Sequence, residues 1–510
     1  MNPIRPVHLF WLVVLVGVWA LFGMTGRGAW HPDEALLLGE IQAWHLDGVW
    51  PVAAASPLYV FLTGWGASLA PAGLTPEDGA RLVSAGFTLL ALLFTALAGR
   101  ALFGRGHGAI AALALMGAFG LMLRAHALLP GIGLLTAYAL LLFGVARARQ
   151  SAAGAGAAIG LALAALLFLR GLPDLVAGSL IAVLPLLSPA WREPVYIRAL
   201  RRAVLWWLAA LGLWLGLLAL QPGDLVAAWV ARLGTGLTPG RDLGGLLELL
   251  TWFVWPLWPL ALWTLWHEHR RLGRASDLHP LWLALVVLAV LTLWPTHSSQ
   301  DVALPLLPAL ALLAAHGVES LRRGAAQAFY WFGVLCFVFF SLAFWLYFAA
   351  IQWQWPTALA ARMARLAPDY QVGVVVAGAV WLAAGLTLLW LVAMPLFPRA
   401  KARPILVWST GMWLSWMLLI ALFKPWAEES WGYRPLIARL AAQIETGACI
   451  ETEVDPAMSA MLRQQIGERL GGSACRYHLG LAAEAEGELR WQGYRPRAKR
   501  QVYFLHERKG

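Results

Sequence analysis

The sequence has few charged residues and almost no cysteine. Of its 510 residues, 13% are Asp, Glu, Lys or Arg, whereas 60% are hydrophobic and the mean hydropathy is +0.67. A soluble globular domain has about 25% charged residues, so this composition excludes an ordinary soluble enzyme as well as a disordered chain. The three cysteines, Cys336, Cys449 and Cys475, are too few for a disulfide scaffold or a cysteine metal cluster.

Motifs that would indicate several other functions are also missing. The chain has no Walker phosphate-binding loop, no Gly-x-Gly-x-x-Gly turn, no His-Glu-x-x-His zinc motif and no Cys-x-x-Cys pair. It contains no nucleic-acid-binding module. The formal net charge is +11, but the basic residues follow the membrane topology described below, so we expect no nucleic-acid partner.

Long apolar runs are what the sequence does have. Runs of about 20 residues recur along the chain, each long enough to cross the ~30 Å hydrocarbon core of a bilayer. We therefore predict an all-α polytopic membrane protein, with many of its 30 Trp residues as interfacial anchors. The first run lacks a small-residue cleavage site, so we interpret it as an anchor rather than a signal peptide. The thirteen or so expected spans are 8–25, 80–99, 107–124, 128–146, 152–169, 173–190, 203–220, 246–266, 279–295, 302–318, 328–350, 371–397 and 404–423.

The distribution of basic residues predicts the orientation of these spans. With the N-terminus in the cytoplasm, the cytoplasmic segments hold 17 Lys and Arg residues, against 8 on the opposite face before residue 424. This asymmetry satisfies the positive-inside rule. An odd number of spans then places the C-terminus outside. We expect a multi-pass protein of a bacterial inner membrane, with a cytoplasmic N-terminus and a periplasmic C-terminus.

Acidic residues have the opposite bias, with 12 outside before residue 424 and 4 inside. The positive-inside rule gives carboxylates little weight, so this excess has another cause. Two interpretations remain open. The carboxylates keep the outer loops soluble, or they carry out chemistry on the outer face.

Residues 424–510 differ in composition from the transmembrane part, residues 1–423. Of these 87 residues 24 are charged, compared with 41 of the preceding 423. Apolar residues at helical and strand-like spacing predict a small periplasmic α/β domain. Its expected elements are helices at 433–446 and 456–470 and strands at 475–481, 488–492 and 501–506.

Two of the cysteines fall at strand-like positions of this domain. Outside the cytoplasm a disulfide between Cys449 and Cys475 is permitted, and we expect it to form. Closing a loop of about 27 residues contributes roughly 3 kcal/mol to stability. Cys336 lies within an apolar span, where we expect it to be a small packing residue.

The first outer loop, at about 26–79, contains the most informative segment of the chain. Pro32 favours a helix start, and the carboxylates of Asp33 and Glu34 suit the first turn of that helix. In one interpretation they only complement the helix dipole. In the other, a carboxylate at the bilayer surface acts as a general base on an acceptor hydroxyl or amine, or helps to hold a divalent cation. The apolar face of this helix, which we expect on the membrane, consists of Leu36, Leu37, Ile41 and Trp44.

Further motifs follow in order along the chain. Pro57-Leu58-Tyr59 lies 23 residues after Glu34, Arg81-Leu82 opens the second span, Leu169-Arg170-Gly171 ends the fifth, and Leu304-Pro305-Leu306-Leu307-Pro308 enters the tenth. In the order and topology of these motifs the chain resembles the polytopic C-type glycosyltransferases. The aminoarabinose (lipid A) transferases and protein O-mannosyltransferases are the most similar branches. The resemblance covers nearly the whole chain, although each motif is short.

The resemblance implies an enzyme that transfers a sugar from a polyprenyl-phosphate donor to a lipid or protein acceptor on the outer face, with inversion at the anomeric carbon. It implies that Asp33 is the base, with Glu34 beside it, and that Arg170 lies near the donor phosphate. A guanidinium suits bidentate phosphate binding. The alternative for Arg170 is an interfacial residue whose charged end reaches the membrane surface.

The chain departs from the family pattern at two places. The family has Glu-Lys-Pro-Pro before Leu-Tyr, whereas residues 54–57 read Ala-Ala-Ser-Pro, so the acid and the lysine used near metal and phosphate are missing. The Asp that the family carries at the start of the fourth span is also missing. A divalent metal is therefore left open, with Glu34, His126 and His297 as candidate ligands. Arg124 and His126 are candidates to replace the lost positive charge at the donor phosphate, unless they are merely interfacial.

Other functions remain compatible with the sequence. The chain could be a catalytically degenerate relative that binds glycan or lipid, a lipid or sugar transporter, or a structural membrane protein. Transporters commonly have inverted repeats and ionisable residues near mid-membrane, whereas here the ionisable residues cluster at span ends. The glycine-rich loop 221–246 is either a flexible connector or a gate over the acceptor entrance. His297 and Asp301 are further outer-face candidates.

The charge count generates a prediction about topology. A reporter enzyme that is active only in the periplasm should be active when fused after Gly510 and silent when fused after Arg202, because the basic cluster there is expected to stay in the cytoplasm. Activity measurements on the two fusions test this. The reverse pattern would move Asp33 to the cytoplasmic face.

Overall fold

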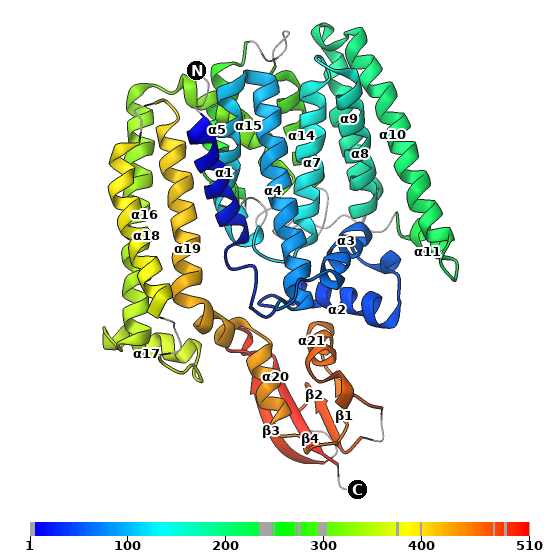
Figure 1. Cartoon of the computed structure of the whole chain (residues 1–510), viewed down its shortest axis with the longest axis vertical. Helices are drawn as coiled ribbons and strands as arrows, with labels where there is room; N and C mark the ends of the chain where they lie inside the picture. The colour runs from blue at the N-terminus through cyan, green and yellow to red at the C-terminus, as the bar shows by residue number, and fades with distance from the viewer. Residues whose placement is uncertain are drawn as a thin grey trace.

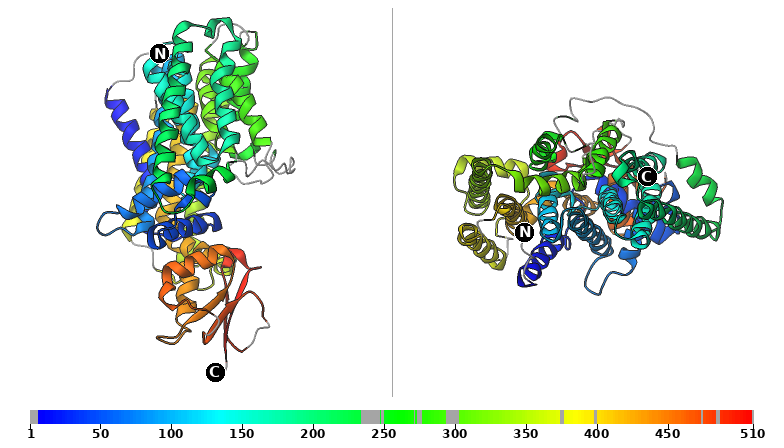
Figure 2. Two further views of the ribbon diagram at one scale, coloured as in Figure 1. Left: turned by 90° about the vertical axis from the view of Figure 1, so that its right-hand side faces the viewer. Right: turned by 90° about the horizontal axis from the view of Figure 1, so that it is seen from above.

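The computed structural model describes residues 6–233, 247, 250–270, 272, 277–293, 303–373, 377–397, 400–472, 475–483 and 487–508. A long helical bundle makes up most of the molecule, and a small sheet with two helices extends from one end (Figure 1). Helix α1 (Pro6–Leu21) begins toward the far end of the bundle, whereas strand β4 (Val502–Glu507) lies in the extension (Figures 1 and 2).

The polytopic helical fold is confirmed, since each predicted span contains a helix within the described residues. Seven of these helices are long and apolar enough to cross a membrane, and four more are shorter apolar helices. The third span is divided between two helices, α5 and α6. After α1 the long elements are α4 (Pro76–Phe103), α5 (Arg105–Met116), α6 (Phe119–Arg124), α7 (Pro130–Arg147), α8 (Ala152–Leu169), α9 (Leu172–Val183), α10 (Pro194–Ala219), α13 (Leu257–His267), α14 (His279–Leu293), α15 (Leu306–Gly317), α16 (Arg323–Gln352), α18 (Ala377–Leu396) and α19 (Arg403–Trp431).

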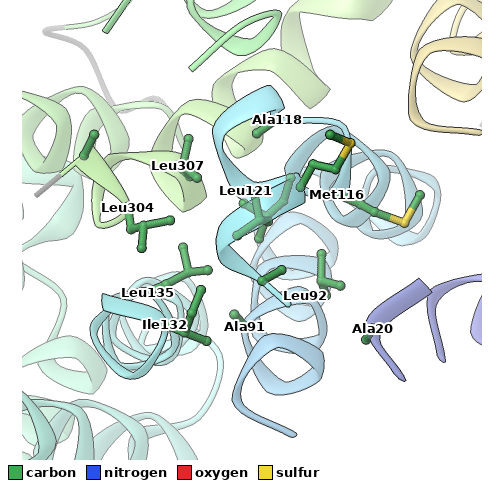
Figure 3. Close-up of a cluster of buried hydrophobic side chains, with 14 of the residues drawn as sticks. Ala20, Ala91, Leu92, Met116, Ala118, Leu121, Ile132, Leu135, Leu304 and Leu307 are labelled. Carbon is green, nitrogen blue, oxygen red and sulfur yellow. The ribbon is translucent and has the colours of Figure 1, made fainter. Parts of the chain in front are cut away.

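The core of the bundle consists of apolar side chains from helices distant in sequence. Leu121, Ile132, Leu135, Leu304 and Leu307 meet there (Figure 3), and each is at most 2% exposed. Small residues let helices approach closely, as expected inside a membrane. The short connecting helices are η2 (Leu184–Leu187), η3 (Pro189–Trp191), α11 (Leu225–Arg232), η5 (Val318–Ser320) and α17 (Thr357–Leu366).

The first outer loop folds into short helices across the end of the bundle. These are α2 (Pro32–Asp47), η1 (Pro51–Ala53) and α3 (Pro57–Ser68), and they lie between the bundle and the C-terminal extension (Figure 1). Two of the four residues of the apolar face that could lie on the membrane do not do so. Leu37 and Ile41 are buried inside the protein, and α2 packs against α3 and α21 (Pro456–Ile466).

The extension is a small α/β unit, which we name the C-terminal domain (residues 434–508). Its sheet has the order β1-β2-β4-β3, with β1 parallel to β2 and the other neighbours antiparallel. Cys449 and Cys475 form a disulfide with a Cα–Cα distance of 5.2 Å, which ties together the starts of the parallel strands. The remaining elements are α20 (Arg434–Ala441), β1 (Ile450–Glu453), η6 (Gly467–Arg469), β2 (Tyr477–Gly480), β3 (Glu488–Tyr494) and η7 (Pro496–Ala498).

The last long helix does not end where its apolar run ends. The sequence predicts a span that stops at residue 423, but α19 continues through Pro425 to Trp431. Its final turns are packed inside the protein, because Trp426, Ala427 and Ser430 are buried. Tertiary contacts therefore extend the helix into a segment whose composition is that of an outer domain.

Candidate functional site

The centre of the outer end is a buried carboxylate, Glu34, with no solvent exposure. Arg27 binds it through both terminal nitrogens at 3.0 Å, and Nε of Arg81 donates to it at 2.9 Å. The backbone N–H groups of Trp30 and Leu128 donate to it as well, at 3.2 and 3.4 Å. Five donors from three separate segments thus converge on one side chain.

A second carboxylate, Glu428 of α19, holds the loop that precedes α2. It accepts hydrogen bonds from the Gly28 backbone N–H at 3.1 Å and from the Trp30 indole N–H at 2.7 Å. A Cβ atom on Gly28 would lie 2.6 Å from Glu428 Oε1, so a larger residue there would displace the carboxylate from its present position. One turn earlier on α19, Lys424 donates to the Thr25 carbonyl at 2.9 Å. The loop is therefore held over its whole length by α19.

Arg81, at the start of α4, has further partners. Its guanidinium donates to the Arg27 carbonyl at 2.8 Å and lies 3.7 Å from both Glu77 and Asp78. Asp78 also accepts from the Gly26 backbone N–H at 2.8 Å. The charges of this cluster come from the first turn of α4 and from the loop together, and the two arginines favour the ionised form of Glu34.

The electrostatics of Glu34 follow from this geometry. Burial opposes ionisation, but Arg27 and Arg81 lower the pKa of Glu34 from 4.5 to about 2. A carboxylate that stays ionised and accepts five hydrogen bonds is a fixed counter-ion. It is poorly suited to take a proton from an acceptor, because its lone pairs are already engaged.

A cavity of about 340 Å³ opens beside this cluster. Its walls come from the first outer loop, from α6 and the segment after it, from α19 and from the C-terminal domain. They combine indole rings with cationic groups and leave Glu34 as the only lining carboxylate in the described part of the chain. The lining side chains include Arg27, His31, Glu34, Arg124, His126, Trp30, Trp252, Trp416, Trp431 and Arg497.

Asp33 is exposed in the first turn of α2, between the lining residues His31 and Glu34. His31 is the N-cap residue of this helix and makes no side-chain cap hydrogen bond. Burial, together with the positive charges of Arg124 and Arg497, lowers the pKa of His31. The helix start thus places a neutral imidazole and an exposed carboxylate beside a cationic cavity.

The structure places Arg170 in a different neighbourhood from Arg124, His126 and Glu34. It follows α8 and lies 3.6 Å from the buried carboxylate of Asp174, which also accepts a hydrogen bond from Tyr138 at 2.8 Å. Its side chain is 30% exposed. Arg170 does not line the cavity, so the predicted donor-binding residues are divided between two places.

A second group of charged side chains includes Arg170, Arg232 and Glu40. The Leu172 N–H donates to the Leu233 carbonyl at 3.3 Å, which brings the end of α11, with Arg232, next to Arg170. Glu40, on α2, accepts a hydrogen bond from the Ala55 backbone and is influenced by the charge of Arg232, while burial raises its pKa. A carboxylate of α2 and the arginine at the end of α11 therefore lie near one another, with the Ala55 backbone beside the carboxylate.

Two of the three candidate metal ligands are already engaged by other groups. Glu34 is engaged by two arginines, and both ring nitrogens of His126 face backbone carbonyls, Nδ1 that of Met122 at 2.5 Å and Nε2 that of Trp19 at 2.6 Å. His297 lies outside the described residues, as do Asp301 and much of the predicted gate in loop 221–246. Within the described ranges, no three His, Cys, Asp or Glu side chains gather as potential ligands.

Several residues of this site were not identified from the sequence. Arg27, His31 and Trp30 lie in the right loop, but nothing in their spacing singles them out. Glu428 and Arg497 come from 400 or more residues further along, so only folding brings them here. Arg81 was visible as part of a motif, and its role as the partner of Glu34 follows only from the structure.

The arrangement of these elements defines a class of fold. This fold combines a polytopic helical bundle, an outer loop whose helix start carries Asp33 and Glu34, and a C-terminal α/β domain at the same end. No protein-family model matches the sequence, and no curated protein is significantly similar to it.

Solved structures of ArnT from Cupriavidus metallidurans share this fold. The apo structure and the structure bound to undecaprenyl phosphate each match with a TM-score of 0.68 and 16% sequence identity. The match covers 98% of this chain and 98% of ArnT in both cases. The bundle and the C-terminal domain thus both have counterparts in that protein.

Two adjacent carboxylates allow a stability prediction. Glu34→Gln should cost about 3–5 kcal/mol, because it leaves Arg27 buried without its ion-pair partner and takes the nearest of three carboxylates away from Arg81. Asp33→Asn, one residue away and exposed, should leave the melting temperature of the purified protein nearly unchanged. The two variants are compared by thermal unfolding in detergent.

The same comparison has a defined pH dependence. Because the pKa of Glu34 is lowered in the folded protein, its stabilisation is complete above pH 4.5 and is lost as the pH falls toward 2. The difference in melting temperature between wild type and Glu34→Gln should therefore narrow below pH 4.5. A difference that stays constant down to pH 3 would contradict the role of Glu34 as a buried anion.

Proposed function

We propose that this protein is a membrane glycosyltransferase that moves a sugar from a polyprenyl-phosphate donor to a lipid or protein acceptor at the outer, periplasmic face of a bacterial inner membrane. The observation that carries the proposal is the start of α2, where an exposed carboxylate, Asp33, stands beside a cationic cavity within an ArnT-like fold. Membrane lipids surround the bundle, and an enzyme whose donor has a lipid tail needs access to them.

In this proposal Asp33 is the general base. It accepts the proton from the acceptor's hydroxyl or amine while that oxygen or nitrogen bonds to the anomeric carbon. The bond between the anomeric carbon and the phosphate oxygen breaks on the opposite side, and its electron pair leaves with the polyprenyl phosphate. Cationic groups stabilise the charge that develops on this leaving group.

The donor is inferred from two sources. A protein of the same fold has been solved with undecaprenyl phosphate bound. In this chain Arg170 lies near a second arginine, Arg232, at the end of α11. We propose that Arg170 binds the donor phosphate, and that Glu34 positions the start of α2 rather than reacting itself.

The other candidate functions are less well supported. A transporter would be expected to carry ionisable groups near mid-membrane, whereas Glu34, Arg81, Arg124 and Arg170 all lie at the outer end. A degenerate binding protein would not need the exposed Asp33 beside its cavity. Mass spectrometry of cell-envelope glycolipids and glycoproteins, with and without the gene, tests the proposal. A sugar-sized mass difference is expected, and its absence under every growth condition would contradict transfer.

The base assignment predicts the behaviour of Asp33→Asn. Asparagine keeps the shape of the side chain and caps a helix as well as aspartate does, but it cannot accept the proton. Turnover should fall by roughly 10²–10⁴-fold, whereas the protein level and melting temperature remain near those of the wild type. Sugar transfer by purified protein is the measurement, and full activity in Asp33→Asn would remove it from the catalytic role.

The donor assignment predicts a graded effect at Arg170. Arg170→Ala should weaken donor binding strongly, and Arg170→Lys should restore only part of it, because the ammonium loses the bidentate geometry. The affinity for undecaprenyl phosphate is measured in detergent. The melting temperature of each variant is measured first, because Arg170 also faces the buried Asp174 and its loss could destabilise the fold. Unchanged affinity in a folded Arg170→Ala variant would exclude Arg170 from the site.

A further inference from the structure

The C-terminal domain contributes a side chain to the cavity at the end of the membrane bundle. Arg497 lies in the short helix η7, between β3 and β4, and it is one of the groups that line the cavity. Arg27, Arg124 and His31 line the same cavity from the membrane part of the chain. The cavity is therefore incomplete without the domain that follows α19.

The loop that carries Arg497 is held firmly in place. The guanidinium of Arg495 is buried, lies 3.9 Å from the centre of the Tyr433 ring and donates to the Trp431 carbonyl at 3.3 Å. Arg497 itself lies over the Trp431 ring, 4.8 Å from its centre. Stacking on an indole orients a guanidinium without neutralising its charge. Arg497 is thus positioned at the cavity wall before any ligand arrives.

The charges around the cavity favour an anion. Arg27 is neutralised by Glu34, but within the described residues no carboxylate forms an ion pair with Arg497. Arg124 and Arg497 line the cavity together with His31, and burial and the positive charges of both arginines lower the pKa of His31. A cavity lined by these two guanidinium groups suits a phosphate group, because guanidinium groups make strong charge-assisted bonds to phosphate oxygens.

We propose that Arg497, acting with Arg124, binds a phosphate group of a lipid substrate, so that the C-terminal domain supplies one side of a phosphate-binding clamp. The phosphate belongs either to the polyprenyl donor or to an anionic lipid acceptor, and the chemistry of recognition is the same for both. This inference rests on the proposed function and extends it, since it makes the outer domain part of the substrate site.

The test uses the full-length protein in nanodiscs of neutral phosphatidylcholine. Four probe lipids are titrated and followed by native mass spectrometry: undecaprenyl phosphate, undecaprenol, phosphatidic acid and diacylglycerol. The variants are Arg497→Gln, Arg497→Lys and the matched control Arg500→Gln, which removes an exposed cation three residues away that does not line the cavity. Each variant's melting temperature is measured first.

Arg497→Gln should weaken the binding of one of the two phosphate lipids by about ten- to a hundredfold, the loss expected for a charged hydrogen bond. Arg497→Lys should lose less, and Arg500→Gln should bind like the wild type. The two alcohols, which lack the phosphate, should be unaffected by any variant. The lipid that responds identifies the source of the phosphate.

Wild-type affinity of Arg497→Gln for both phosphate lipids would overturn the inference, as would an equal loss in Arg500→Gln, which would indicate only general surface charge. Sugar transfer by the wild type distinguishes this failure from failure of the proposed function. If the wild type transfers sugar and Arg497→Gln binds both phosphate lipids as the wild type does, only the phosphate-binding clamp is overturned. Arg497-dependent binding without any transfer overturns the glycosyltransferase function and leaves the phosphate site standing.

Discussion

The buried ion cluster of Glu34 with Arg27 and Arg81 is the constraint on which the outer end of this protein depends. Removing a carboxylate from water costs several kcal/mol, and the cost is recovered only when every lone pair is engaged with good geometry. Glu34 meets that condition with five donors from the first outer loop, the start of α4 and the segment before α7. None of these segments can move without leaving a charge buried and unpaired. The start of α2, which carries Asp33 and His31, is fixed for that reason.

Ion pairs and charged hydrogen bonds also join the C-terminal domain to the membrane bundle. Glu428 holds the loop at Gly28 and Trp30, and Arg434 pairs with Glu77 at 3.0 Å, in the first turn of the helix that carries Arg81. Charged contacts are thus shared between the loop, α4 and the domain boundary. A domain docked in this way can present a residue of its own to the cavity, and Arg497 occupies that position.

These contacts also bear on the excess of acidic residues outside. Most of the acidic residues that are buried are explained neither by the solubility of the loops nor by catalysis. Glu34, Glu77 and Asp78 surround Arg81, and Asp174 faces Arg170. These carboxylates pair with arginines that are buried or partly buried, and the pairing offsets the cost of burying both charges. Asp33 stands apart from this group, because it is exposed and has no such partner among the described residues.

The sequence by itself determined the membrane character, the helix in each expected span and the small α/β domain, since these depend on local composition and on periodicity that a single segment carries. It also identified the first outer loop as the segment that carries the candidate site. The tertiary structure decided which residues of that loop are exposed at the cavity and which are buried in ion pairs. Asp33 and Glu34 are neighbours with the same chemistry, and only their surroundings make one an exposed carboxylate and the other a buried counter-ion. The apolar face of α2 shows the same limit, because periodicity indicates that a face is buried but not whether lipid or protein covers it. Glu34 and Arg81 are 47 positions apart in the sequence, and Trp30 and Glu428 are 398 positions apart. Contacts between residues so far apart cannot be predicted from a local sequence pattern.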